Sequence, residues 1–312
     1  MTIRAFQPGD DLAQVGIYNE AAAGLPRFKP ATVDEVRRRV LAADFDPATR
    51  LFAVEGGAAV AYCTFSATGR LGVPWCRKGH ERHAEPLLHA ALEGMRQRGV
   101  KKAFAAYRAD WPEVKDFLQA HGFSLAREMV GYALPLVEMP TPSARIGTGI
   151  SLVTKADLPA MLEMGKGLLR LSTLAEAEQW FFQNDYFPPS SLFAHRPAPG
   201  AAPSAIGIVV SSKAFADPLA VDANMPCFRL GAFGTEGLTH KRIDGMFSIL
   251  APDTRDFPAL ALDLLAWANR KLEDGDAATL AAQAPSDAAH LTRFYKGVFR
   301  RQGAFPVYER AL

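Results

Sequence analysis

The sequence predicts an α/β fold made of two copies of one unit, joined head to tail near residue 145. The same order of strands and helices occurs twice, and a segment rich in proline, serine, threonine and glycine, residues 137–149, separates the copies. A chain of 312 residues is also longer than one average domain. We therefore expect one domain at 1–138, a linker at 139–148 and a second domain at 149–312.

Composition and charge exclude several classes of protein. Apolar residues make up 49% of the chain and charged residues 22%, as is typical of folded globular domains. A net charge of +2 is too small to produce an electrostatic field that would attract nucleic acid or a membrane surface. The chain shows neither a leader pattern nor a long apolar run, and its three cysteines are far apart. We expect a soluble, cytoplasmic protein, and its oligomeric state stays open.

Each unit opens with a strand and a helix. In the first unit we expect a strand at 3–6 and a helix whose N-cap is Asp10 or Asp11. In the second, the strand covers 150–153 and the helix follows Asp157.

A hairpin comes next in both units. Two β-prone runs at 51–54 and 58–63 are joined through residues 55–57, Glu-Gly-Gly, and the Gly-Gly pair predicts a tight turn. The corresponding runs of the second unit are 192–195 and 205–210.

A helix with a proline in its first turn follows in each unit. Pro86 and Pro258 suit this position because the N–H that proline lacks would be unpaired there. The apolar residues after each proline recur with helical spacing and predict one buried stripe. They are Leu87, Leu88, Ala91, Leu92 and Met95 in the first unit, and Leu264, Leu265, Ala268 and Leu272 in the second.

Each unit ends with a strand, a helix and a last strand. These elements are expected at 103–107, 111–121 and 123–134, and again at 277–282, 287–295 and 305–312. Phe123 and Tyr132 in the first unit have the same spacing as Phe299 and Tyr308 in the second. The second unit also has an insertion at about 213–244, which predicts either a functional loop or an additional edge hairpin.

This repeated order resembles the GCN5-related N-acetyltransferase (GNAT) superfamily. The resemblance rests on the hairpin LFAVEGGAAVAYCTF, the helix AEPLLHAALEGMRQRGV and the ending FLQAHGF. The helix and the ending have counterparts in the second unit, ALDLLAWANRKL and RFYKGVF. The two-domain arrangement is similar to that of the mycothiol-synthase type. The resemblance implies two α+β domains, each a mixed, mostly antiparallel twisted sheet flanked by helices.

The resemblance also implies a site for acetyl-CoA. The fourth and fifth strands of such a domain splay apart, and the pantetheine arm lies between them like an extra strand. The loop after the fourth strand then holds the pyrophosphate at a helix start, usually with the pattern Arg/Gln-x-x-Gly-x-Gly/Ala. The corresponding loops here, 79–84 and 256–261, lack the leading Arg or Gln and the middle glycine.

The two loops differ in charge. The second loop has Arg255 nearby, but Asp253 and Asp256 would repel a phosphate. The first carries basic side chains that predict phosphate binding, with a solvated basic helix start as the alternative. The predicted cofactor-binding residues are Arg77, Lys78, His80, Arg82, His83 and Ala84.

The same resemblance implies a catalytic acid. An amine attacks the thioester directly, and a tyrosine on the helix before the last strand protonates the leaving thiolate. Tyr295 occupies this position in the second unit, whereas Leu118 occupies it in the first. The alternative for Tyr295 is a residue packed in the core. Glu236 and Asp253 are candidate bases, or plain surface carboxylates.

The sequence has two further features, an aromatic run and a pair of histidines. An aromatic run at 180–182, with Tyr186 and Phe187, could line a substrate pocket or belong to the core. His80 and His83 are close together, but no cysteine or carboxylate pair lies at a matching distance in the sequence, so we expect no metal.

We therefore expect an acyl-CoA-dependent N-acyltransferase with acetyl-CoA as the default donor and a small-molecule or peptide amine as the acceptor. The alternative is a catalytically silent ligand-binding or interaction protein on the same scaffold.

Overall fold

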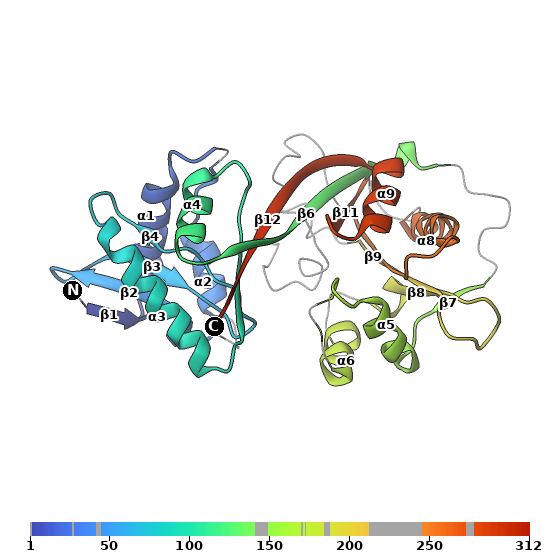
Figure 1. The fold of residues 1–312 in the computed structure, drawn as a ribbon, viewed down its shortest axis with the longest axis horizontal. Coiled ribbons are helices and arrows are strands. Elements are labelled where there is room, and N and C mark those ends of the chain that lie inside the picture. Colours follow the sequence, from blue (N-terminus) through green and yellow to red (C-terminus); the bar gives the residue numbers. More distant parts are fainter. Residues whose placement is uncertain are drawn as a thin grey trace. The chain divides into compact units, whose positions relative to one another are not determined.

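A computed structural model describes residues 2–26, 28–41, 45–140, 149–169, 171, 173–183, 188–211, 245–272 and 278–312 (Figure 1). The chain divides into two compact units. Unit 1 consists of Met1–Arg127 and Phe305–Leu312, and unit 2 of Glu128–Ala304. The predicted insertion at 213–244 and the candidate base Glu236 lie outside the described residues.

Unit 1 begins with a four-stranded sheet of order β1-β2-β3-β4. In chain order its elements are β1 (Thr2–Ala5), α1 (Asp10–Ala22), α2 (Val33–Val40), η1 (Pro47–Thr49), β2 (Arg50–Glu55), β3 (Ala58–Thr64), β4 (Trp75–Cys76), η2 (Glu81–His83), α3 (Ala84–Gln97), β5 (Lys102–Ala106), α4 (Pro112–Ala120) and the start of β6 (Ser124–Pro135).

The β2–β3 hairpin confirms the turn predicted from the sequence. Gly56 and Gly57 have φ angles of 60° and 84°, and Glu55 is paired with Ala58 across the turn. Positive φ at both central residues matches the right-handed twist of the strands, and glycine adopts it without strain. The turn therefore fixes the register that leaves Glu55 at the end of β2.

Two helices of unit 1 test the sequence predictions. All five apolar residues predicted for the stripe of α3 are buried. The predicted N-cap of α1 is wrong, because α1 begins at Asp10 and its N-cap is Gly9 with a φ angle of 98°. The Asp10 carboxylate instead accepts the Gln7 N–H at 2.7 Å and pairs with Arg4.

Unit 2 continues from β6. Its further elements are η3 (Leu136–Glu138), β7 (Ile150–Leu152), η4 (Lys155–Asp157), α5 (Leu158–Met164), α6 (Leu174–Phe182), η5 (Pro189–Ser191), β8 (Leu192–His195), β9 (Ala205–Ser211), β10 (Gly245–Leu250), α8 (Phe257–Leu272), β11 (Thr279–Pro285), α9 (Ala289–Val298) and β12 (Arg300–Ala311).

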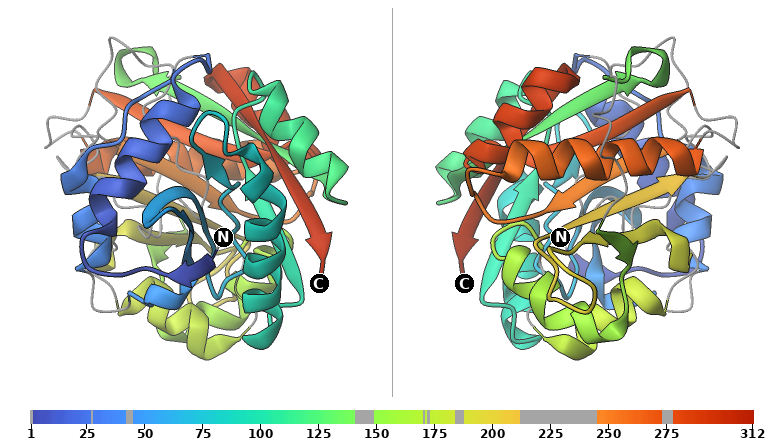
Figure 2. Two further views of the ribbon diagram at one scale, coloured as in Figure 1. Left: turned by 90° about the vertical axis from the view of Figure 1, so that its left-hand side faces the viewer. Right: turned by 90° about the vertical axis from the view of Figure 1, so that its right-hand side faces the viewer.

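The helix α8 covers β9 and β10 (Figure 2). Its predicted stripe, Leu264, Leu265, Ala268 and Leu272, is buried, and Phe257 is buried at its first turn. Fully burying one leucine side chain stabilises a fold by about 1.5–3 kcal/mol. The first turn of α8 is therefore packed into the same core as β10, through Phe257.

The last strand of each half of the sequence pairs outside that half. The eight-stranded sheet has the order β5-β12-β6-β11-β10-β9-β8-β7. β6 is antiparallel to β11 from Met129↔Pro285 to Pro135↔Thr279, and the end of β12 is antiparallel to β5. Tyr308 accordingly belongs to the core of unit 1, and Tyr132 to that of unit 2.

The two units therefore differ from the predicted division at 138 and 149. The sequence repeat has the predicted element order, but the chain exchanges its final strands, so unit 1 is completed by Phe305–Leu312.

None of the described helices is long and apolar enough to cross a membrane.

The fourth and fifth strands diverge in both units. In unit 2, β10 and β11 are parallel neighbours at Gly245↔Leu280 and Met246↔Ala281, the two positions of pairing within the described residues. In unit 1, Arg70 bridges Phe104 in parallel, and β4 then pairs with β3 alone among the described strands. Along the described residues beyond each divergence, the fourth strand is therefore no longer paired with the fifth.

Candidate functional site

In unit 2, the phenol of Tyr295 lies at the strand divergence. Tyr295 belongs to α9, and its hydroxyl makes a hydrogen bond with the backbone of Ile249 on β10, which tends to lower its pKa. A hydrogen bond lowers the pKa of a phenol when the hydroxyl oxygen accepts it, so the Ile249 N–H is the donor. Ile249 lies beyond the last β10–β11 pair, so the hydroxyl of Tyr295 accepts a backbone hydrogen bond at the position where the strands have separated.

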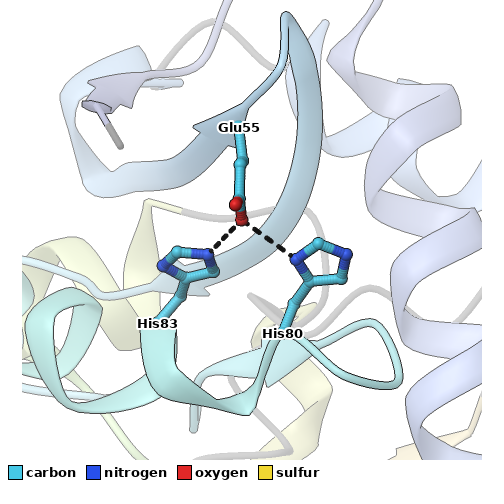
Figure 3. A group of neighbouring side chains, drawn as sticks. All are labelled: Glu55, His80 and His83. Carbon is cyan, nitrogen blue, oxygen red and sulfur yellow. Dashed lines mark hydrogen bonds and ion pairs between the residues drawn. The ribbon is translucent and has the colours of Figure 1, made fainter.

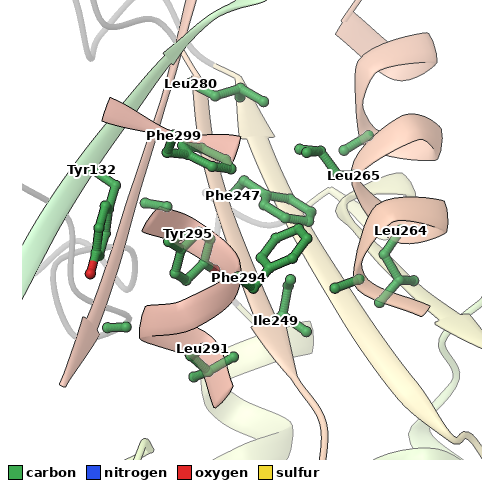
Figure 4. Close-up of a cluster of buried hydrophobic side chains, with 14 of the residues drawn as sticks. Tyr132, Phe247, Ile249, Leu264, Leu265, Leu280, Leu291, Phe294, Tyr295 and Phe299 are labelled. Atoms are coloured by element: carbon green, nitrogen blue, oxygen red, sulfur yellow. The ribbon is translucent and has the colours of Figure 1, made fainter. Parts of the chain in front are cut away.

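Burial dominates the chemistry of this hydroxyl. The side chain of Tyr295 is 1% exposed, and burial raises the pKa of the phenol well above its usual range. The ring contacts Phe294 and Phe299 edge-on (Figure 4). The hydroxyl therefore keeps its proton at neutral pH, as a general acid must.

A second tyrosine stacks on the first. The rings of Tyr132 and Tyr295 lie 5.3 Å apart between centroids with an interplanar angle of 28°. Tyr132 comes from β6, opposite Ala282 of β11, and burial raises its pKa. Its buried hydroxyl has no hydrogen-bond partner among the described residues. In the sequence, Tyr132 is recognisable only as a marker of the repeat.

Unit 1 has a tyrosine at the corresponding divergence, but on a different element. The Val73 N–H donates to the hydroxyl of Tyr107, just after β5, at 2.7 Å. Burial raises the pKa of Tyr107 to about 12. The rings of Trp75 and Trp111 lie 6.4 Å and 6.1 Å from that of Tyr107. Aromatic side chains therefore pack where the strands of unit 1 separate.

The loop before α3 contains the residues predicted to bind the cofactor. Arg77 forms an ion pair with Glu20 at 2.6 Å, and the Lys78 N–H donates to the same carboxylate at 3.0 Å. The Gly79 N–H donates to Glu81 at 2.9 Å. Hydrogen bonds from Lys78 and then Arg77 lower the pKa of Glu20. Part of this loop is therefore already bound to carboxylates.

The carboxylate of Glu55, the last residue of β2, is contacted by side chains of the same loop (Figure 3). His83 Nε2 lies 2.9 Å and His80 Nδ1 3.2 Å from its Oε2 atom, and Arg82 contacts both oxygens at 2.6 Å. Hydrogen bonds from His83 and Arg82 lower the pKa of Glu55 to about 2. In the sequence Glu55 was only part of a turn, because its partners lie 25 to 28 residues further along the chain.

The corresponding segment of unit 2, residues 251–256, connects β10 directly to α8. Asp253, Arg255 and Asp256 are all exposed. The Phe257 N–H donates to the Thr254 carbonyl at 3.1 Å, which forms the turn into α8. The candidate base Asp253 thus lies at the same end of β10 as the helix start.

The remaining predictions concern the aromatic run of unit 2 and Leu118 of unit 1. Phe181 is fully buried in the core of unit 2, as in the core interpretation of the aromatic run. Tyr186 and Phe187 lie outside the described residues. Leu118 is fully buried in unit 1.

No family model matches the sequence, and no curated protein matches it. Solved structures match over nearly the full length. A GCN5-related N-acetyltransferase from Sphaerobacter thermophilus has 14% identity and a TM-score of 0.62, with 99% of this chain and 95% of that chain covered. A tandem GNAT protein from the clavulanic acid biosynthesis pathway has 14% identity and a TM-score of 0.55, with 99% and 98% covered.

The chain has the tandem GNAT fold. A third structure, N-myristoyltransferase of Saccharomyces cerevisiae with bound myristoyl-CoA, has 10% identity and a TM-score of 0.50, with 99% of this chain and 78% of that chain covered. At these identities the likeness concerns the fold alone, because one fold can carry many different chemistries.

Within the tandem GNAT fold, the two units retain different side chains. Unit 2 has Tyr295 at its strand divergence, and unit 1 has Leu118 on the corresponding helix. The basic loop is in unit 1, where Arg77, Arg82 and the two histidines contact carboxylates. Ala84 begins α3 behind them. The cofactor-binding role of this loop stays a prediction, since a phosphate there would compete with Glu20 and Glu55.

Proposed function

We propose that the chain is an acyl-CoA-dependent N-acyltransferase whose reaction takes place in unit 2. The observation that carries this proposal is the buried hydroxyl of Tyr295, which accepts the N–H of Ile249 where β10 and β11 have separated. Acetyl-CoA is the default donor, and the acceptor is a small-molecule or peptide amine.

The proposed reaction is a direct transfer. The acceptor nitrogen attacks the thioester carbonyl, the new C–N bond forms, and the C–S bond breaks with its electron pair remaining on sulfur. Tyr295 donates its proton to the leaving thiolate, and a base takes the proton of the amine. Asp253 stays a candidate for this base, because it is exposed at the end of β10.

The separated strands of unit 2 suit a pantetheine arm. Beyond Met246, β10 has no pairing with β11 in the described residues, and an extended chain can add to a strand edge of this kind. The dipole and first N–H groups of the 16-residue helix α8 favour the pyrophosphate. The carboxylates of Asp253 and Asp256 oppose it, so we expect weaker binding than a glycine-rich loop would provide.

Unit 1 is better suited to a catalytically silent role. Its equivalent of Tyr295 is the buried Leu118, which has no proton to donate to a leaving thiolate. We propose that unit 1 performs no acyl transfer of its own.

Calorimetric titration with acetyl-CoA tests the function. We expect saturable binding to the full chain, with free CoA binding as well because the phosphates and pantetheine are retained. The absence of binding at millimolar acetyl-CoA would contradict the proposal and favour the silent scaffold.

A further inference from the structure

Two histidines and one glutamate converge in unit 1 (Figure 3). Glu55, His80 and His83 each offer one ligand atom, and these three atoms lie within 4.8 Å of one another. The two distances to the carboxylate oxygen are 3.2 Å from His80 and 2.9 Å from His83. Both imidazoles thus direct a ring nitrogen to the same oxygen.

These separations suit a metal ion. Zinc binds imidazole nitrogen and carboxylate oxygen at about 2.0–2.2 Å, so the ligands of a tetrahedral site lie about 3.3–3.5 Å apart. Both measured distances to Glu55 are slightly shorter, and the part-exposed side chains of Glu55 and His80 can shift to reach this spacing around the buried His83. Imidazole ligands favour zinc, cobalt or nickel over magnesium or calcium.

The local fold explains why the two histidines face the same way. His80 is the N-cap of the 3₁₀-helix η2, and the His83 N–H donates to its carbonyl at 3.1 Å. Because such a turn has three residues, the side chains of residues 80 and 83 point in a similar direction. Their rings are nearly parallel, with an interplanar angle of 18° and centroids 6.0 Å apart. The Gly56–Gly57 turn places Glu55 opposite them.

Arg82 supports the carboxylate in the same arrangement. Its Nη2 atom lies 2.6 Å from both oxygens of Glu55. A carboxylate has lone pairs for both an arginine and a metal, and a contact of this kind orients a metal ligand. Arg82 also reduces the negative charge that attracts a cation, so we expect moderate rather than very tight affinity.

The site is open on one side. The side chains of Glu55 and His80 are 39% and 30% exposed, whereas that of His83 is 2% exposed. A metal can therefore enter from solvent, and three protein ligands leave a fourth position for water or an anionic ligand.

We propose that Glu55, His80 and His83 form a binding site for a divalent transition-metal ion of the zinc type. His80 would bind through Nδ1 and His83 through Nε2, each in the tautomer that carries its hydrogen on the other ring nitrogen. The site lies within unit 1 and does not depend on the proposed acyl transfer in unit 2.

Metal titration of the full chain tests this proposal. After treatment with a chelator, Zn²⁺ is titrated by calorimetry, and Co²⁺ is titrated by visible absorption to detect nitrogen and oxygen coordination. We expect one saturable site and a rise of the melting temperature with Zn²⁺. His80→Ala and Glu55→Gln should each weaken the binding by more than about tenfold.

His89→Ala is the matched control, because His89 is an exposed histidine of α3 near Glu85, at 3.9 Å. It should leave the affinity unchanged. Since His83 is buried and its replacement could unfold the loop, the decision rests on His80 and Glu55, with circular dichroism to confirm folding. The proposal is overturned if Zn²⁺ does not bind, or if the His80 and Glu55 variants bind it as the unmodified chain does.

Discussion

Tyr308→Ala should destabilise unit 1 by about 3–5 kcal/mol, the usual cost of removing a large buried aromatic side chain. Tyr308 is 4% exposed and belongs to the core of unit 1, although it lies near the end of the chain. It also lies opposite Ala105 in the pairing of β12 with β5. Chemical unfolding, with hydrogen exchange of β5 as a local probe, measures the effect.

Glu309→Gln is the control for this experiment. The neighbouring residue Glu309 pairs with Lys102 at 2.8 Å, and the Lys102 side chain is 61% exposed. An exposed pair of this kind contributes about 0–1 kcal/mol. If Tyr308→Ala destabilised the chain no more than this control, or left the exchange of β5 unchanged, the exchange of final strands would be wrong.

Tyr295→Phe should lower kcat for acyl transfer by about 100-fold or more, because the variant lacks the proton for the leaving thiolate. The ring, and so its packing against Tyr132 and Phe299, is retained. We therefore expect a small change in the KM for acetyl-CoA. Because the buried Ile249 N–H loses its acceptor, we expect a loss of stability of about 1–3 kcal/mol. Steady-state kinetics with an amine acceptor, following thiol release, measures both constants.

Tyr107→Phe is the matched control for the reaction. It removes the hydroxyl that accepts the Val73 N–H at the divergence of unit 1. If the reaction takes place in unit 2, this variant retains kcat. An unchanged kcat for Tyr295→Phe would show that the acid is another residue, and a loss confined to Tyr107→Phe would transfer the chemistry to unit 1.

Local patterns were sufficient to predict the repeated elements. The Gly-Gly turn after Glu55 and the apolar stripe after Pro86 are properties of short segments, and both are found as expected. Turn conformation and helical periodicity depend on neighbours in sequence, which explains why they can be predicted.

The exchange of final strands could not be predicted in this way. The pairs Phe123–Tyr132 and Phe299–Tyr308 have equal spacing, so either strand fits either unit by pattern alone. Alternation determines which face of a strand is buried, but not which strand lies beside it. The partner is decided by long-range contacts, and these place Tyr132 and Tyr308 in different cores.

The same limit applies to the candidate sites. Tyr295 could be named because it lies in a short pattern, whereas its bond to Ile249 depends on the packing of α9 against a distant strand. Glu55 could not be named, since it contacts His80 and His83 only after the hairpin and η2 have folded together.

Hydrogen exchange of the full chain with and without acetyl-CoA tests the central claim, that unit 2 holds the acyl donor. We predict that saturating acetyl-CoA slows exchange in the second half of β10 and in the first turn of α8, residues 247–260. Residues 73–88 of unit 1, which include the basic loop, should exchange as before. Slower exchange confined to 73–88, or no change at millimolar acetyl-CoA, would contradict the account.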